Sequence, residues 1–244
     1  MLFSTSVIFY LVELESLHYH RSMCGIFGFV ASPGTEFELG RVRSFLKDLF
    51  LLSEPRGREA SGLAISANNE IRIIKFGLSP SDMLRSSSYL DFLNRTLANV
   101  KTQSGKLNTP VAVIGHCRMV TNGAEIVPGN NHPILTQHSV GIHNGIVTND
   151  ANLWRKHPDL VRNHETDSEI LFKLINKHTQ VTTSLVTGVR NTFKEIEGTA
   201  SIAFLRSDAP VLGLATNVGS LHTIHDNNGL FLFASEAFVL NGFI

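Results

Sequence analysis

The sequence has few features of a disulfide scaffold, a metal protein or a polyanion binder. It contains only two cysteines, Cys24 and Cys117, and no C-x-x-C pair, so neither a disulfide framework nor a zinc site is expected. Its 21 basic and 21 acidic residues cancel, and the charge therefore indicates no nucleic-acid or membrane-surface binding. The 11 histidines show no metal-ligand spacing. We predict a cytoplasmic protein with no metal, no cofactor, no nucleic-acid partner and no membrane association.

Residues 1–22 are the segment whose role the composition leaves open. Their apolar run, residues 7–12, is too short to span a bilayer, and neither a basic start nor a small-x-small cleavage site accompanies it. We expect this segment to be a leader or propeptide that is removed, or a mis-assigned start ahead of Met23. Residues 23–244 contain no repeat, low-complexity tract or linker, which predicts one domain.

Apolar periodicity predicts a domain that mixes strands with helices. Residues 24–31 and 111–117 are short apolar runs typical of buried strands, and residues 38–54 repeat apolar side chains at helical spacing. Thr166 is expected to cap a helix, with Glu169 at the spacing of a capping box. Further helices are predicted at 80–99 and 184–195, with a cap at Ser79 or Ser81, and further strands at 62–66, 71–76, 140–143, 199–205, 211–216, 221–225 and 230–234.

Clusters of small and polar residues interrupt the apolar pattern where strands end, which is where sites are usually built. In chain order they are MCGIFG (23–28), RGREASG (56–62), GHCRMVTNG (115–123), NNHP (130–133), HNGIVTN (143–149) and ETDSE (165–169). This ordered set resembles the class II glutamine amidotransferases, which are N-terminal-nucleophile hydrolases. It is similar to the glutaminase domains of glucosamine-6-phosphate synthase and amidophosphoribosyltransferase, from Met23 nearly to the C-terminus.

The resemblance implies an α+β fold, a four-layer αββα sandwich of two antiparallel sheets with helices outside. It also implies that Cys24 is the nucleophile and the first residue of the mature protein. A thiol of ordinary pKa, about 8.5, is only slightly ionised at neutral pH and needs a base. In this family the base is the free α-amine of the same cysteine. An amide nitrogen in mid-chain cannot take the proton, so cleavage just before Cys24 is expected.

The expected reaction is hydrolysis of the glutamine side-chain amide. Thiolate attack creates an oxyanion, loss of ammonia leaves a thioester, and water releases glutamate. By resemblance, the side-chain amide of Asn144 and the backbone N–H of Gly145 stabilise the oxyanion.

The glutamine backbone carries one charge of each sign, and the resemblance assigns a partner to each. Arg118 matches the arginine that forks onto the α-carboxylate, Thr121 matches the hydroxyl beside it, and Asp167 matches the carboxylate that holds the α-ammonium. Arg56 and Gly57 match a motif that lines the site near the nucleophile.

Two departures affect what happens around the site. Met119 and Asn122 stand where glucosamine-type members have an aromatic residue and a histidine, so loop closure over glutamine is expected to differ. Family glutaminase domains continue past Glu236 and are usually fused to an acceptor domain. We therefore expect one of two arrangements. Either this is a stand-alone amidotransferase that passes its ammonia to a synthase partner subunit, or the domain is truncated at its C-terminus and the fused acceptor domain is missing.

Other interpretations remain open from the sequence alone. The chain could be another N-terminal-nucleophile amide hydrolase, or a non-catalytic glutamine-binding module if residues 1–22 are retained. Cys24 could be a buried strand cysteine, Asn144-Gly145 a hairpin turn, Asp167 a helix cap, and Arg118 and Arg56 surface ion-pair residues. Cys117 is interpreted as a core substitution, because strand neighbours such as His116 point to the opposite face.

Overall fold

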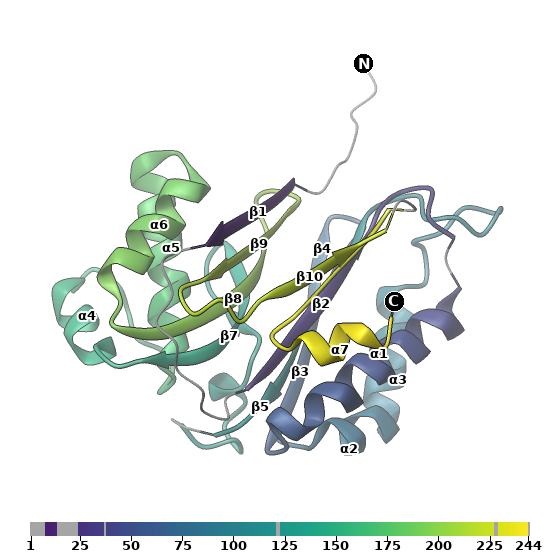
Figure 1. The fold of residues 1–244 in the computed structure, drawn as a ribbon, viewed down its shortest axis with the longest axis horizontal. Coiled ribbons are helices and arrows are strands. Elements are labelled where there is room, and N and C mark those ends of the chain that lie inside the picture. Colours follow the sequence, from purple (N-terminus) through teal and green to yellow (C-terminus); the bar gives the residue numbers. More distant parts are fainter. Residues whose placement is uncertain (1–7, 14–23, 37, 121–122, 227–228, 244) are drawn as a thin grey trace.

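In a computed structural model of the chain, two β-sheets face each other and helices cover both outer faces (Figure 1). The structure describes residues 8–13, 24–36, 38–120, 123–226 and 229–243. The layers confirm the predicted α+β, four-layer αββα sandwich.

The first sheet has six strands in the order β10-β11-β2-β5-β3-β4, and every neighbouring pair is antiparallel. The strands are β2 (Gly25–Ala31), β3 (Ala60–Ala67), β4 (Glu70–Phe76), β5 (Val111–Arg118), β10 (His222–His225) and β11 (Leu230–Ala234). All were predicted from the sequence. The turn between β3 and β4 is formed by Asn68 and Asn69, both at positive φ.

The second sheet has five strands in the order β1-β9-β8-β7-β6. They are β1 (Ile8–Glu13), β6 (Ile134–Leu135), β7 (Ser139–Val147), β8 (Gly198–Arg206) and β9 (Val211–Thr216). The expectation of purely antiparallel sheets is wrong at one edge, since β1 pairs parallel with β9. Part of the predicted leader, residues 8–13, is thus an edge strand of this sheet.

Each sheet has its own helical layer. The six-stranded sheet is covered by α1 (Leu39–Ser53), α2 (Pro80–Arg85), α3 (Ser87–Thr96) and α7 (Ala237–Asn241), with the short η1 (Glu54–Arg56) after α1. On the other side lie α4 (Asp150–Lys156), α5 (Ser168–Thr182) and α6 (Leu185–Glu195) (Figure 1). A further short turn, η2 (Pro128–Asn130), lies in the loop after β5.

The single helix predicted over residues 80–99 is two helices. Ser86 has extended backbone angles between them, and its hydroxyl accepts from the N–H of Tyr89 at 3.2 Å. Ser79 caps α2 as predicted, by accepting from Asp82 N–H. The alternative cap, Ser81, instead donates to Glu54. A second capping hydroxyl therefore restarts the helix within one periodic pattern.

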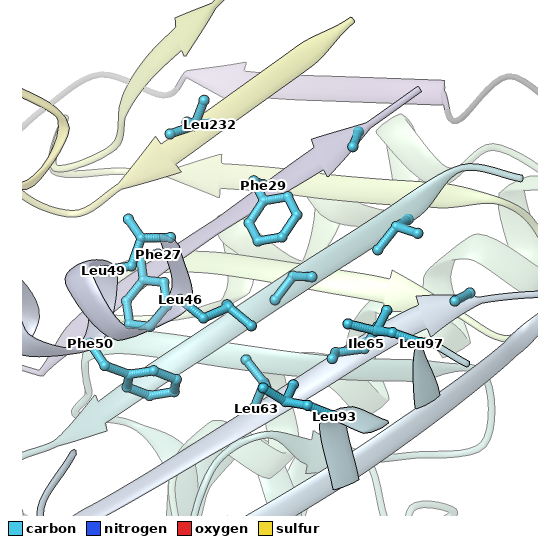
Figure 2. Close-up of a cluster of buried hydrophobic side chains, with 14 of the residues drawn as sticks. Phe27, Phe29, Leu46, Leu49, Phe50, Leu63, Ile65, Leu93, Leu97 and Leu232 are labelled. Carbon is cyan, nitrogen blue, oxygen red and sulfur yellow. The ribbon is translucent and has the colours of Figure 1, made fainter. Parts of the chain in front are cut away.

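Side-chain alternation along β2 separates two cores. Phe27 and Phe29 face outward, where they pack with Leu46 and Phe50 of α1 (Figure 2). The Phe27 and Phe50 rings meet edge to face at 4.7 Å, a favourable aromatic geometry. Even-numbered Ile26 lies instead in the core between the sheets. The face on which a strand residue lies thus follows from its parity.

Candidate active site

Cys24 lies directly before β2, on the inner side of the six-stranded sheet. Cys24 is two residues before Ile26, so both side chains lie on the same face of the sheet, and Ile26 belongs to the core between the sheets. Gly25 pairs with Cys117 of β5, so Cys24 is beside the end of β5 that carries Arg118. Its sulfur accepts from the backbone N–H of Met119 at 3.2 Å and lies 3.4 Å from the Met119 carbonyl oxygen.

The Cys24 thiol is held in its protonated form. Cys24 is half-buried as a residue, and burial of the thiol raises its pKa to about 11, although the Met119 N–H and Arg118 act in the opposite direction. The backbone N–H groups of Met119 and of Cys24 itself lower the thiol pKa, but burial outweighs them. A thiol in this setting becomes a nucleophile only with the help of a base.

Arg118 places a buried positive charge near the sulfur. It is 4% exposed, and its parity on β5 points it to the inner face with Ile114. Its guanidinium donates to Asn131 Oδ1 at 2.6 Å and to the Gly123 carbonyl oxygen at 2.8 Å. The interpretation of Arg118 as a surface ion-pair residue is therefore wrong.

The RG pair of the second motif lies against this corner of the site. A Cβ on Gly57 would be 2.2 Å from the carbonyl carbon of Arg118, so only glycine permits this close approach. The Cβ of Arg56 is next to the backbone of Gly25, but its guanidinium pairs with Glu236 at 3.0 Å. Arg56 therefore lies near the nucleophile, but its charge is paired with Glu236. This agrees with the alternative interpretation of Arg56 as an ion-pair residue.

Asn144 faces the sheet of Cys24 from the other side of the sandwich. It lies within β7, on the same face as Ile142 of the inner core, so the hairpin-turn interpretation is wrong. Asn144 is 1% exposed, and neither its amide nitrogen nor its amide oxygen has a hydrogen-bond partner among the described residues. Leaving a buried amide unpaired costs about 1–3 kcal/mol of folding free energy. An unpaired amide in a site is therefore expected to be paired when a ligand binds.

Gly145 next to it cannot be replaced without strain. Its φ is +151°, and a Cβ there would be 2.0 Å from the carbonyl oxygen of Thr199. The glycine allows β7 to continue past Asn144 in a backbone conformation that other residues rarely adopt.

Asp167 joins the start of α5 to the end of β7. It is 4% exposed, and its Oδ2 accepts from the backbone N–H of Val147 at 2.7 Å. Asp167 raises the pKa of Cys24 whereas Arg118 lowers it, so charges of both signs act on the sulfur. Asp167 is the residue before α5, but its side chain makes no capping hydrogen bond.

The predicted capping box at this helix start is only half formed. The Thr166 hydroxyl accepts from Ser168 N–H at 3.3 Å. Glu169, however, reaches back to the N–H groups of Asn163 and His164, at 2.8 Å for the latter. Because Glu169 is completely buried, it fixes the loop before α5 rather than the helix terminus.

Three buried histidines behind the site were missed by the sequence analysis, which treated them as scattered. His116 Nε2 lies 3.0 Å from the His143 carbonyl oxygen, and its ring stacks on His132 at 4.1 Å. His143 Nδ1 lies 2.9 Å from the hydroxyl of Ser168. Burial lowers the pKa of all three, that of His116 to about 3, so they are neutral. Their position inside three of the motifs was the available signal.

The structure tests the prediction for Cys117 but not the one for Thr121. Cys117 lies in the outer core, with its sulfur 3.8 Å from the Phe50 carbonyl oxygen, which confirms it as a core residue. Thr121, and Asn122 next to it, lie outside the described residues.

Other features of the described chain do not add to this site. No group of three or more potential metal ligands occurs among the described residues, and no helix there is long and apolar enough to cross a membrane. A cavity of about 540 Å³ lies between α1 and β2, lined by residues that include Phe29, Val42 and Phe45. None of the predicted site residues lines it.

Sequence comparison identifies similar proteins over most of the chain. The glutamine–fructose-6-phosphate aminotransferase of Zymomonas mobilis is 28% identical over 222 residues, which are 89% of this chain and 32% of the relative. The amidophosphoribosyltransferase of Methanocaldococcus jannaschii is 28% identical over 195 residues, 77% of this chain and 36% of the relative. The chain therefore spans about a third of the length of these relatives.

Structural comparison gives the same fold at lower sequence identity. The glutamine phosphoribosylpyrophosphate amidotransferase from B. subtilis superimposes with a TM-score of 0.61 at 16% identity, over 89% of this chain and 43% of that one. The family described as a glutamine amidotransferase domain matches residues 116–241, just over half of the chain. The chain belongs to this glutamine amidotransferase domain family.

Proposed function

We propose that this domain hydrolyses the side-chain amide of glutamine through a thioester on Cys24 and delivers the ammonia to an acceptor site. The observation that carries the proposal is the buried amide of Asn144, which lies on the face opposite the Cys24 thiol and has no hydrogen-bond partner in the described part of the chain. A preorganised donor of this kind has its use when negative charge develops on a substrate oxygen.

The proposed reaction proceeds through proton transfers and one thioester intermediate. The Cys24 sulfur loses its proton to a base and attacks the amide carbon, and the carbonyl oxygen becomes an oxyanion between Asn144 Nδ2 and Gly145 N–H. The returning proton converts the leaving nitrogen into ammonia, and the C–N bond breaks to leave a thioester. Water then adds to the thioester and releases glutamate and the thiol.

Arg118 and Asp167 are proposed to hold the glutamine backbone. The guanidinium binds the α-carboxylate and the carboxylate binds the α-ammonium, through Asp167 Oδ1, because Oδ2 already accepts from Val147 N–H. Thr121 is proposed to add a hydroxyl beside Arg118. Gly57 contributes by its close packing on the Arg118 backbone, and Arg56 by its position beside the Cys24–Gly25 backbone.

The base is proposed to be the α-amine of Cys24, released by cleavage after Met23. A thiol whose pKa is about 11 needs such a base at neutral pH. The alternative that residues 1–22 stay attached has one supporting observation, the pairing of residues 8–13 with β9. In that case the chain would bind glutamine without hydrolysing it.

The acceptor is proposed to lie on a synthase subunit or a further domain. Ammonia is protonated in water, so an unaccompanied glutaminase would lose its product as ammonium. The cytoplasmic location remains a prediction.

Glutaminase activity of a chain that begins at Cys24 tests the proposal. We expect glutamate to be released from glutamine by this chain and not by its Cys24→Ala variant. The full-length chain, analysed by intact mass before and after the assay, should be active only in proportion to the fraction that begins at Cys24. Equal activity of Cys24→Ala, or full activity of an uncleaved chain, would remove the assignment. Hydrolysis of N-acyl substrates in place of glutamine would favour a different amide hydrolase.

A further inference from the structure

Asn131 connects three parts of the site through one buried residue. It is 1% exposed. Its Oδ1 accepts from Arg118 at 2.6 Å, its Nδ2 donates to the Glu125 carbonyl oxygen at 2.7 Å, and its own carbonyl oxygen accepts from Lys75 Nζ at 2.9 Å. The amide orientation is fixed by chemistry, because a guanidinium only donates and a carbonyl only accepts.

The chemical type of this contact matters for the charge of Arg118. Arg118 is buried, and two acceptors of its guanidinium, Asn131 Oδ1 and the Gly123 carbonyl oxygen, are neutral. The carboxylates of Glu125, Asp167 and Glu59 also act on the Arg118 charge, but Asn131 orients the guanidinium without adding a negative charge of its own. A carboxylate at position 131 would form a charge-assisted pair and compete with any incoming carboxylate.

We propose that Asn131 is a positioning residue that makes the site select for an α-carboxylate, by orienting Arg118 without neutralising it. The inference rests on the proposed role of Arg118 in glutamine binding and adds the residue that sets this specificity.

The neighbouring Asn130 provides a matched control. It is also 1% exposed and also belongs to the loop after β5. Its side chain donates to Glu165 Oε2 at 2.9 Å and accepts from Glu165 N–H at 3.1 Å. Asn130 therefore ties the same loop to the segment before α5, whereas Asn131 ties it to Arg118. A purely structural effect of disturbing this loop should appear in both positions.

The test measures binding in the full chain with Cys24→Ala, so that it does not depend on turnover. The two ligands are glutamine and 4-aminobutanamide, which is glutamine without its α-carboxylate. Binding of each ligand is measured by ligand-observed NMR titration. We expect Asn131→Asp and Asn131→Ser to raise the Kd for glutamine about tenfold or more and to change the Kd for 4-aminobutanamide less than about threefold. Asn130→Ala should affect both ligands by the same factor.

A second readout separates positioning from folding. Asn131→Asp would gain a charge pair with Arg118 but lose the hydrogen bond to the Glu125 carbonyl oxygen. Its thermal unfolding midpoint should therefore fall no further than that of Asn130→Ala, while only the Asn131 variants lose glutamine affinity selectively. In the active chain that begins at Cys24, the same variants should raise KM for glutamine and change kcat less than about threefold.

The outcomes distinguish this inference from the proposed function. Equal loss of both ligands in the Asn131 variants, unchanged glutamine affinity, or absence of glutamine binding in the parent would each overturn it. A parent that binds glutamine selectively through Asn131 but never hydrolyses it would uphold the inference and remove the proposed glutaminase activity.

Discussion

Two polar clusters in this domain use their hydrogen-bonding groups in opposite ways. In the first, around Cys24 and Asn144, the amide of Asn144 has no partner among the described residues. In the second, which we call the Glu195 cluster, Lys156 and His157 both bind one carboxylate oxygen, Glu195 Oε2, at 2.8 Å. A polar group surrounded by protein partners stabilises the fold, whereas one that lacks them is available to a ligand.

The largest expected effect concerns ionisation of the Cys24 thiol. Because the pKa of the Cys24 thiol is about 11, its alkylation rate in the full chain at pH 8 should be about a thousandfold lower than the limiting rate at high pH. In a chain that begins at Cys24, the α-amine can take the proton, and the rate at pH 8 should rise at least about tenfold. Alkylation with iodoacetamide, followed by mass spectrometry across pH, measures both.

Residual labelling in Cys24→Ala corrects for Cys117, whose pKa burial raises well above its usual value. Equal Cys24 rates in the two chains at pH 8 would contradict the role of the amine.

The next effect distinguishes the two clusters directly. Asn144→Ala should lower kcat about a hundredfold or more. It should cost less than about 1 kcal/mol of unfolding free energy, because the Asn144 amide makes no hydrogen bond to any described residue. Asn149 is the matched control, because its amide donates to the Glu195 carbonyl oxygen at 2.9 Å and accepts from Glu197 N–H at 3.0 Å. Asn149→Ala should cost about 1–3 kcal/mol and leave kcat within about threefold.

Glutaminase kinetics and urea unfolding give the two readouts. The comparison between the clusters breaks down if both asparagine variants lose the same property.

The smallest effect is in the Glu195 cluster. Burial opposes ionisation of Glu195, but hydrogen bonds from Lys156 and His157 outweigh it and lower the pKa from 4.5 to about 2. A lowered carboxyl pKa stabilises the fold above pH 4.5, and this stability is lost as the pH falls toward 2. Glu195→Gln should therefore cost about 1–2 kcal/mol at pH 7, allowing for solvent screening.

Thermal unfolding from pH 7 to pH 2.5 should show the wild-type advantage shrinking as the solution becomes acidic. An advantage that is constant with pH would indicate that packing, not charge, is responsible.

Much of the sandwich could be predicted because strand signals are local. The central strands β2, β3 and β5 are short runs of mostly apolar residues. Side-chain alternation along β2 and β5 then places Cys24 and Arg118 on the inner face. The same reasoning missed α4, which is only seven residues long, and the parallel pairing of β1. A short helix has too few turns for periodicity, and a pairing partner about 200 residues away leaves no local signal.

The candidate site residues were named from ordered motifs, but their contacts were beyond reach of the sequence. Nothing in the sequence indicated that Asn131 would hold Arg118, or that Glu169 would serve Asn163 and His164 instead of its own helix terminus. Such contacts depend on how a loop folds back in three dimensions. A loop's conformation is set by side-chain hydrogen bonds that have no periodic pattern.

The position of β2 between β5 and β11 constrains the order in which the domain can assemble. Ile26 N–H donates to the hydroxyl of Ser235, a residue 209 positions away, and Leu230 pairs with Ala31. During synthesis, one side of the Cys24 strand therefore stays unpaired until β11 has left the ribosome. The strand that follows Cys24 consequently has an unpaired edge, open to wrong pairing with other strands, until the chain as far as β11 has been synthesised.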